Sequence, residues 1–462
     1  MVPLGVLDRI LAAMMFTLPG QTKDCRSRTV RNVRRHACSL IVKISIQHPQ
    51  LLLPCFDYLK NSIEKLCLLS EDAAQLSRME RVTLQEALLI ISNQFNNFEM
   101  QTQFIGQVIR PAAEQWKQPN LQIAFESAAG FMSFVGLDTA PVEPSNQDIK
   151  GQNRSELVLC TNIFLAIVKR CRAPQDPSAA MQNSGSSEVA VCHPAAPHLA
   201  PLLFNTFRLA RVLHGLWEPA ARCALAPGFV KAYDMLDSEI VNLMGQGAVS
   251  SNGSGASMNM NSIDSGSLSS DHTRVVSPLE RVQQFLAQLH FNVFNFLGSL
   301  GETLGHEFYA LPGLATAVAG TACYCLEHIP DYRLRVVIRV FCRPFIVSCP
   351  SNLHESVLLP VLLHLCPALL HRLTQRWEKV VANAEHQPDE HNGADFQEVV
   401  QDMIGRMLTR EYIDVLKLIL FTSAGASDSV AGVDDDMETS ENTHADVIIR
   451  KLFFFFHNQI LT

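Results

Sequence analysis

The sequence predicts an all-α protein. Apolar residues recur at three- and four-residue steps through most of the 462 residues, which is the period of a helix that buries one face. No stretch alternates apolar and polar residues for long enough to require a β-strand. Helical stretches come in pairs spaced by roughly 40 residues, which is typical of a HEAT- or armadillo-like superhelix. We therefore expect an α-solenoid of about a dozen helices, with a helical bundle as the alternative.

Proline and glycine divide the N-terminal region into six predicted helices. Pro19-Gly20 ends the first helix and His48-Pro49 ends the second, because proline cannot continue a helix and glycine favours its end. We expect Pro111 to bend or break the fifth helix. The six predicted ranges are 4–18, 26–46, 51–69, 78–95, 98–116 and 121–136.

Loops separate the later helices. The segment 245–277 is rich in Gly, Ser and Asn and almost uncharged, so it cannot bury enough apolar surface to order itself, and we expect a flexible loop there. Further predicted segments are helical regions at 1–137, 153–244 and 278–422, loops at 138–152 and 173–198, and an acidic, disordered tail with an atypical C-terminus at 423–462. The helices predicted after residue 137 are 154–172, 200–217, 219–244, 278–300, 302–328, 333–348, 351–383 and 397–422.

Composition narrows the possible functions. A hydrophobic content of 47% supports a large core, and the net charge of −8 argues against a general polyanion binder. The charge is segregated, because the stretch Asp428–Asp446 holds seven carboxylates and no Lys or Arg. The 13 cysteines are odd in number and irregularly spaced, which predicts reduced thiols, without a disulfide framework or a metal site.

Motifs of catalysis and membrane insertion are missing from the sequence. It contains no Walker loop, no G-x-S-x-G and no H-E-x-x-H, so we expect a binding scaffold without a cofactor rather than an enzyme. No secretory signal is visible at the N-terminus. The best uncharged apolar run, Phe308–Leu326, contains Pro312, Gly313 and Gly320, which favours a packed helix over a membrane span.

The predicted helix 26–46 carries a row of arginines. Its apolar stripe is formed by Val30, Val33, Ala37, Leu40, Ile41 and Ile44. At about 100° per residue, Arg28, Arg31 and Arg35 fall on the opposite face, and Arg34 sits at the edge of the stripe. Guanidinium groups present planar donors that suit phosphate oxygens. The alternative is an ordinary solvated helix face.

Several short segments of the sequence resemble segments of one protein family, and they occur in the same order as in that family. They are VRNVRRHACS (30–39), EALLIISNQF (86–95), IPDYRLR with VIRVF (329–341), GQNR (151–154), KAYDMLDSE (231–239), PLERVQQF (278–285) and RMLTRE (406–411). Together they resemble the middle to C-terminal region of proteins of the exportin-5 family. These proteins are karyopherins of the importin-β superfamily. The resemblance runs from about residue 4 to residue 440 and implies a segment truncated at both ends.

The resemblance implies a HEAT-repeat receptor that catalyses nothing. Such a receptor shuttles between nucleus and cytoplasm, and with Ran-GTP and nuclear pore components it exports hairpin RNA such as pre-microRNA. It implies no membrane and no DNA partner. A-form RNA is recognised by shape, phosphates and 2′-hydroxyls, with a 3′ overhang held separately. The alternative is a HEAT-repeat scaffold or adaptor that binds protein and no RNA.

The resemblance also assigns candidate RNA contacts. Arg35 matches an arginine of the tunnel that takes the overhang, and Ser77-Arg78 stands where the family has a Thr-Gln pair. Arg154 and Arg281 match family arginines that face the RNA, although Arg154 could simply begin a helix and Arg281 could pair with Glu280. The full set of candidates is Arg31, Arg34, Arg35, Ser77, Arg78, Arg154 and Arg281.

Overall fold

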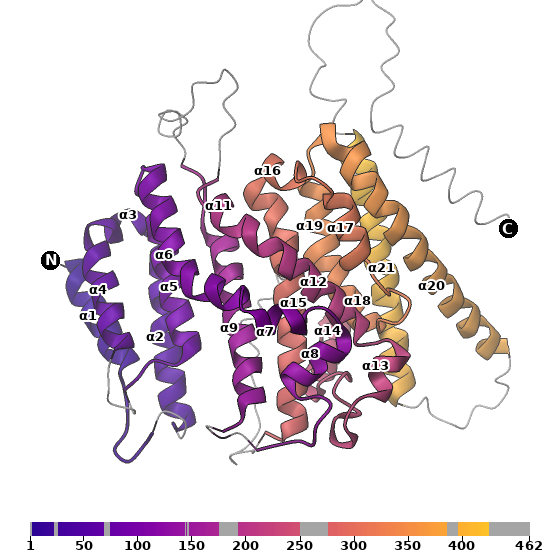
Figure 1. The fold of residues 1–462 in the computed structure, drawn as a ribbon, viewed down its shortest axis with the longest axis horizontal. Coiled ribbons are helices and arrows are strands. Elements are labelled where there is room, and N and C mark those ends of the chain that lie inside the picture. Colours follow the sequence, from indigo (N-terminus) through magenta and orange to yellow (C-terminus); the bar gives the residue numbers. More distant parts are fainter. Residues whose placement is uncertain are drawn as a thin grey trace, which may run out of the picture. The chain divides into compact units, whose positions relative to one another are not determined.

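A computed structural model describes residues 2–22, 26–68, 74–143, 145, 147–174, 193–249, 276–385 and 396–424. Within these ranges every regular element is helical (Figure 1), which confirms the all-α prediction and agrees with a solenoid of paired helices. The predicted loop 173–198 lies largely outside these ranges. So do most of the predicted loop 245–277 and residues 425–462 of the predicted tail.

The helices follow one another with short connections. Up to residue 170 they are α1 (Val2–Met14), α2 (Arg28–Gln47), α3 (Pro49–Leu52), η1 (Leu53–Cys55), α4 (Phe56–Cys67), α5 (Arg78–Ser92), α6 (Phe98–Trp116), α7 (Pro119–Ala124), α8 (Ala128–Val135) and α9 (Ile149–Arg170). Between residues 196 and 304 they are α11 (Ala196–Leu199), η3 (Ala200–Leu202), α12 (Leu203–Gly215), α13 (Pro219–Cys223), η4 (Pro227–Phe229), α14 (Asp237–Val249) and α15 (Pro278–Leu304). The remainder are α16 (His306–Tyr309), α17 (Leu314–Thr321), α18 (Asp331–Val337), η6 (Ile338–Cys342), α19 (Arg343–Ser348), η7 (Ser351–Leu353), η8 (His354–Leu358), α20 (Leu359–Glu385) and α21 (Phe396–Ala424).

The chain forms two compact units built from interleaved segments. Unit 1 comprises Met1–Gln122, Glu156–Thr206 and Ser299–Leu311. Its core is organised around α2, which packs against α1 and α5. Phe56 meets Phe95 and Phe104 edge to face, with ring centroids 4.8 and 5.2 Å apart, the geometry that aromatic quadrupoles favour.

Unit 2 comprises Ile123–Ser155, Phe207–Gly298 and Pro312–Thr462. Its core includes the fully buried side chains of Phe294, Leu297 and Phe341. The helices α18 and α19 pack against α21, and α17 packs against α20. Two π-helical turns, η6 and η8, interrupt the regular helices of this unit.

Proline affects the helices in ways that the sequence pattern only partly predicts. Of the bend or break predicted at Pro111, the break is wrong, because α6 runs through Pro111 to Trp116, with Ile109 and Ala112 buried on either side. The predicted helix 219–244 is wrong as one element, because it divides into α13, η4 and α14. Pro219 and Pro227 each stand at the beginning of a piece, where a missing N–H costs no hydrogen bond.

Caps and turns explain three further differences between the predicted and the observed elements. The predicted helix 121–136 is two helices, because Ser127 caps α8 by accepting a bond from Gly130 N. The predicted helix 302–328 is broken between α16 and α17, where Gly313 adopts a φ of 73°. The predicted loops 138–152 and 245–277 are shorter, because α9 begins at Ile149 and α14 continues to Val249.

One stretch of the described chain, Ser351–Ala382, is long and apolar enough to cross a bilayer by length and composition, with a mean hydropathy of 1.6. Half of its most apolar window is buried inside the protein, and core helices of soluble proteins pass the same test. The run Phe308–Leu326 forms no single packed helix of the kind we expected, because α16 and α17 divide it.

Candidate nucleic-acid interface

Helix α2 buries a different face from the one that its apolar pattern predicts. Ser27 begins the helix by accepting a hydrogen bond from Val30 N at 3.3 Å. Leu40, expected in the stripe, is 46% exposed, whereas Arg34 is fully buried. The buried residues of α2 are Val30, Arg34, Ala37, Cys38, Ile41, Val42 and Ser45. The buried face is therefore rotated so that a charged residue lies inside it.

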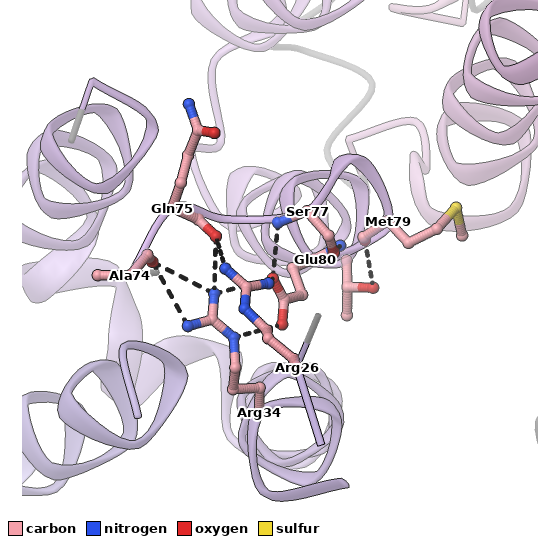
Figure 2. A network of polar contacts seen from close by, with 8 residues as sticks. Arg26, Arg34, Ala74, Gln75, Ser77, Met79 and Glu80 are labelled. Carbon is pink, nitrogen blue, oxygen red and sulfur yellow. Dashed lines mark hydrogen bonds and ion pairs between the residues drawn. The ribbon is translucent and has the colours of Figure 1, made fainter. Parts of the chain in front are cut away.

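Arg34 is held by a carboxylate and by backbone carbonyls (Figure 2). Its Nε donates to Glu80 Oε1 at 2.8 Å, and its Nη2 donates to Glu80 Oε2 at 3.0 Å. Nη2 also donates to the carbonyls of Ala74 and Gln75, at 3.3 and 3.1 Å. Arg26 lies beside it and donates to the same Gln75 carbonyl. Because this guanidinium has no exposed surface, Arg34 joins α2 to α5 and is not available to a phosphate here.

Glu80 is the acidic centre of this network. Burial by itself would raise the pKa of the Glu80 carboxyl, but the hydrogen bonds from Arg34 and Ser77 outweigh it, so the pKa is lowered overall. The carboxylate therefore stays ionised and keeps the buried Arg34 compensated.

Arg28, Arg31 and Arg35 form the exposed arginine row of α2. Arg28 and Arg31 are exposed and Arg35 is half-buried, which confirms that they lie away from the core face. Arg35 Nη2 donates to Asn32 Oδ1 at 3.2 Å, one turn earlier on the helix. This bond holds the guanidinium of Arg35 along the helix surface.

Ser77 and Arg78 lie at the beginning of α5. Ser77 Oγ accepts from Glu80 N at 3.2 Å, and Ser77 N donates to Glu80 Oε2 at 2.7 Å, which together form a capping box. The cap uses one acceptor site of the hydroxyl, and no acceptor among the described residues is bonded to its donor. Arg78 is exposed and its Nη1 donates to Glu156 Oε2 at 2.9 Å.

Arg154 and Arg281 lie together in unit 2. Both line a small pocket of about 30 Å³, whose wall also includes Gly136, Asp148 and Lys150. Gly136 ends α8 with a φ of 76°, a conformation that glycine adopts without strain. Residues that are far apart in the sequence therefore meet in one site, with three cationic side chains on its wall.

Each of the two arginines has a carboxylate partner. Arg154 Nη2 lies 3.3 Å from Asp148 Oδ2, and its Nη1 donates to the Val135 carbonyl at 2.6 Å. Arg281 Nη1 lies 3.2 Å from Glu143 Oε2, so it forms an ion pair with a carboxylate that is far away in the sequence. Burial lowers the pKa of Arg154; Asp148 opposes this, and the nearby Arg281 lowers it further.

The candidate residues therefore form two groups and one exception. Arg31, Arg35, Ser77 and Arg78 belong to unit 1, and Arg154 and Arg281 share a pocket in unit 2. The exception is Arg34, which is buried and donates to Glu80 in the core. Sequence reasoning missed Asp148 and Lys150, although both lie within a turn or two of Arg154 on or beside α9.

Comparison with known proteins agrees with the resemblance seen in the sequence. The model of the Exportin-5 family matches residues 2–461. Exportin-5 of Homo sapiens is 32% identical over 455 residues, which is 95% of this chain and 36% of the relative. Exportin-5 of Mus musculus is 30% identical over 96% of this chain and 36% of its own length. Protein HASTY 1 of Arabidopsis thaliana is 25% identical over 96% of this chain and 35% of its own length.

The chain thus spans about a third of the length of these relatives. The match covers the helices that carry both groups of candidate residues. The chain belongs to the Exportin-5 family.

Proposed function

We propose that this chain is a segment of a nuclear export receptor that binds the double-stranded stem of a hairpin RNA. The RNA would be a pre-microRNA with a short 3′ overhang, bound together with Ran-GTP and carried past nuclear pore components from nucleus to cytoplasm. Membership of the Exportin-5 family supports the export role. The receptor would bind and release its cargo and would catalyse no reaction.

The RNA part of the proposal depends on the position of Arg154 and Arg281 in the wall of the same pocket. A phosphate oxygen at this pocket would accept hydrogen bonds from two guanidinium groups without requiring any particular base. The partner of Arg281, Glu143, is 72% exposed on its side chain, and such an exposed ion pair contributes little. Arg281 can therefore exchange Glu143 for a phosphate at low cost.

The overhang would be held in unit 1. Arg31 is exposed and Arg35 is half-buried on α2, and the hydroxyl donor of Ser77 has no acceptor in the part of the chain that the structure describes. Arg78 pairs with Glu156 at the surface, with 49% and 34% of the two side chains exposed, so this pair can also open. Arg34 is left out of the proposed interface because its guanidinium is buried.

Binding of a labelled hairpin RNA to the whole chain tests the proposal. We expect R154Q/R281Q to weaken binding at least about tenfold, because two charge-assisted contacts are lost. Arg406→Gln is the matched control, because Arg406 is 71% exposed and forms an ion pair with Asp402, one turn earlier on the same helix. A DNA hairpin of the same sequence should bind more weakly, since it lacks A-form geometry and 2′-hydroxyls. Equal binding of wild type and double variant would overturn the RNA assignment.

Addition of Ran-GTP tests the export part. If RNA and Ran-GTP bind cooperatively, Ran-GTP should raise the affinity for the hairpin by roughly tenfold, and the RNA should raise the affinity for Ran-GTP by the same factor. Ran-GDP is the control and should change neither affinity. RNA binding that ignores Ran-GTP would separate RNA recognition from export.

A protein-binding scaffold without RNA binding is the second candidate. The observation that favours it is that Arg78, Arg154 and Arg281 each have a carboxylate partner within the protein. In that case R154Q/R281Q would lower the melting temperature, and the wild-type chain would show no affinity for the hairpin at physiological salt.

A further inference from the structure

A second basic surface lies on unit 2, and it is distinct from the pocket of Arg154 and Arg281. Arg335, Arg339 and Arg343 follow one another at four-residue steps through α18, η6 and α19. All three approach the carboxylate of Glu411 on α21, at 3.8, 3.4 and 3.2 Å. We call these arginines, together with Lys417, the Glu411 basic face.

The π-helical turn explains how three successive arginines reach one carboxylate. In an α-helix, residues four apart drift by about 40° around the axis at each step, so a longer row winds away from a single partner. The η6 turn spans Ile338–Cys342 and has more residues per turn, which rotates Arg343 back toward the side of Arg335. Wide turns of this kind occur frequently at functional sites.

The cations of this face gather around two carboxylates. Arg343 also lies 3.7 Å from Asp414, and Lys417 lies 4.0 Å from the same carboxylate. Four cations therefore share Glu411 and Asp414. Burial lowers the pKa of Arg335; Glu411 opposes this, and the neighbouring Arg339 cation lowers it further. Because these cations lie close together, a further anion at their exposed edges would be favourable.

The Glu411 basic face is accessible. The side chains of Arg339, Arg343 and Lys417 are 32%, 38% and 61% exposed. The exposed guanidinium edge of Arg343 can therefore donate to a second carboxylate without breaking the contact with Glu411, since a guanidinium has five N–H donors.

The sequence itself supplies an anion of matching chemistry nearby. The stretch Asp428–Asp446 contains seven carboxylates and no Lys or Arg. Along α21 the distance from Glu411 to Ala424 is about 20 Å, and the ten residues from Ala424 to Asp434 can extend by about 33 Å. The acidic stretch is therefore long enough to return to the basic face. Such a short tether gives an effective concentration in the millimolar range.

We propose that the acidic stretch Asp428–Asp446 binds the Glu411 basic face of its own chain. Its carboxylates would join Glu411 and Asp414 around Arg339, Arg343 and Lys417. Bound in this way, the stretch occupies a surface that would otherwise attract polyanions. The proposal does not depend on RNA binding elsewhere in the protein.

A labelled peptide of residues 428–446, added to the whole chain, tests this intramolecular contact. The wild-type chain should bind the peptide weakly, because its own acidic stretch occupies the site. The full-length variant D434N/D435N/D436N/E438Q should bind it at least about tenfold more tightly, and R339Q/R343Q introduced into that variant should abolish the gain. A peptide with Asn and Gln in place of every carboxylate should not bind either chain.

Two further measurements keep the test decisive. Arg343→Gln alone leaves Arg335 and Arg339 with Glu411, so it should reduce peptide binding without unfolding the chain, as circular dichroism would verify. Arg406→Gln should have no effect. Equal peptide affinity of the wild-type and neutralised chains would overturn the proposal. So would a neutralised chain that gains affinity for a hairpin RNA through Arg339 and Arg343 but none for the peptide.

Discussion

Arg34 and Arg35 are neighbours in the sequence and have opposite surroundings in the structure. Arg34 is buried against Glu80 of α5, whereas Arg35 lies at the surface and donates to Asn32. A helical pattern treats both as polar and places Arg34 only at the edge of the apolar stripe. The difference arises from a carboxylate that lies far away in the sequence, so periodicity within α2 could not reveal it. The exposed positions of Arg28, Arg31 and Arg35 depend on α2 alone and were predicted correctly.

Replacement of Arg34 tests its structural role. Arg34→Ala leaves the Glu80 carboxylate half-buried without its main partner, so we expect a loss of about 3–5 kcal/mol in the free energy of unfolding. Urea unfolding followed by circular dichroism measures it. Arg31→Ala, on the exposed face of the same helix, should change stability by no more than about 0.5 kcal/mol. Similar small changes for both variants would show that the buried network contributes little.

Replacement of Arg35 tests its assignment to the overhang. Arg35→Ala should weaken binding of a hairpin with a 3′ overhang more than binding of the blunt hairpin, because only the first RNA places a single strand at this helix. Fluorescence anisotropy with the two labelled RNAs measures the difference. An equal loss of affinity for both RNAs would show that Arg35 is only a general phosphate contact.

At the scale of the elements, long amphipathic helices were predictable and their interruptions were not. Helices α2, α5, α15 and α21 lie close to their predicted ranges, because several turns of apolar periodicity identify each. The break between α7 and α8 depends on a capping serine, and the break between α13 and α14 depends on short turns begun by proline. Apolar residues continue through these breaks, so the periodic pattern concealed them.

The N-terminus of α5 allows capping and RNA binding to be separated. Ser77→Ala removes the capping hydroxyl and should cost about 1 kcal/mol in stability. Ser77→Asp should retain most of the cap, since Asp is a good N-cap residue, but its charge should repel a phosphate. Thermal unfolding and hairpin binding measured on both variants provide the comparison. If Ser77→Asp binds the overhang RNA as tightly as wild type, Ser77 serves only the helix.

Helices α12 and α15 bury a pair of histidines in unit 2. The ring of His214 stacks on Phe294 with centroids 4.6 Å apart, and His290 lies 4.6 Å from the same ring. His214 Nδ1 lies 3.1 Å from the Tyr324 carbonyl, whereas neither ring nitrogen of His290 has a hydrogen-bond partner among the described residues. Burial lowers the pKa of His214 to about 3 and that of His290 well below its usual 6.5, with His214 and Arg333 adding to the effect on His290.

These histidines should make the protein acid-sensitive. Above pH 6.5 both are neutral in the folded and unfolded chains and have no effect. Below it the unfolded chain takes up protons that the folded chain cannot, so each histidine should cost about 1.4 kcal/mol per pH unit. His290→Leu should remove one such contribution from urea unfolding measured between pH 6.5 and 5. An unchanged pH dependence would mean that His290 is protonated in the folded protein.

At the scale of the whole molecule, basic and acidic residues are concentrated in different parts of the chain. The net charge of −8 hides the arginine row of α2, the pocket of Arg154 and Arg281, and the Glu411 basic face, because carboxylates and cations nearly balance outside the acidic stretch Asp428–Asp446, which adds seven carboxylates. Composition alone argues against a general polyanion binder and cannot locate a specific site. Arg154 and Arg281 were selected only through the family resemblance, since no helical period relates residues so far apart. Their meeting in one pocket is a result of the tertiary fold.

The salt dependence of hairpin RNA binding tests the central claim most directly. Between about 50 and 200 mM salt, the logarithm of the association constant should fall linearly with the logarithm of the salt concentration. The slope should become shallower by about 0.7–0.9 in Arg281→Gln and by about twice that in R154Q/R281Q, while Arg406→Gln keeps the wild-type slope. Identical slopes for the wild type and the double variant would contradict the claim that these arginines bind RNA phosphates.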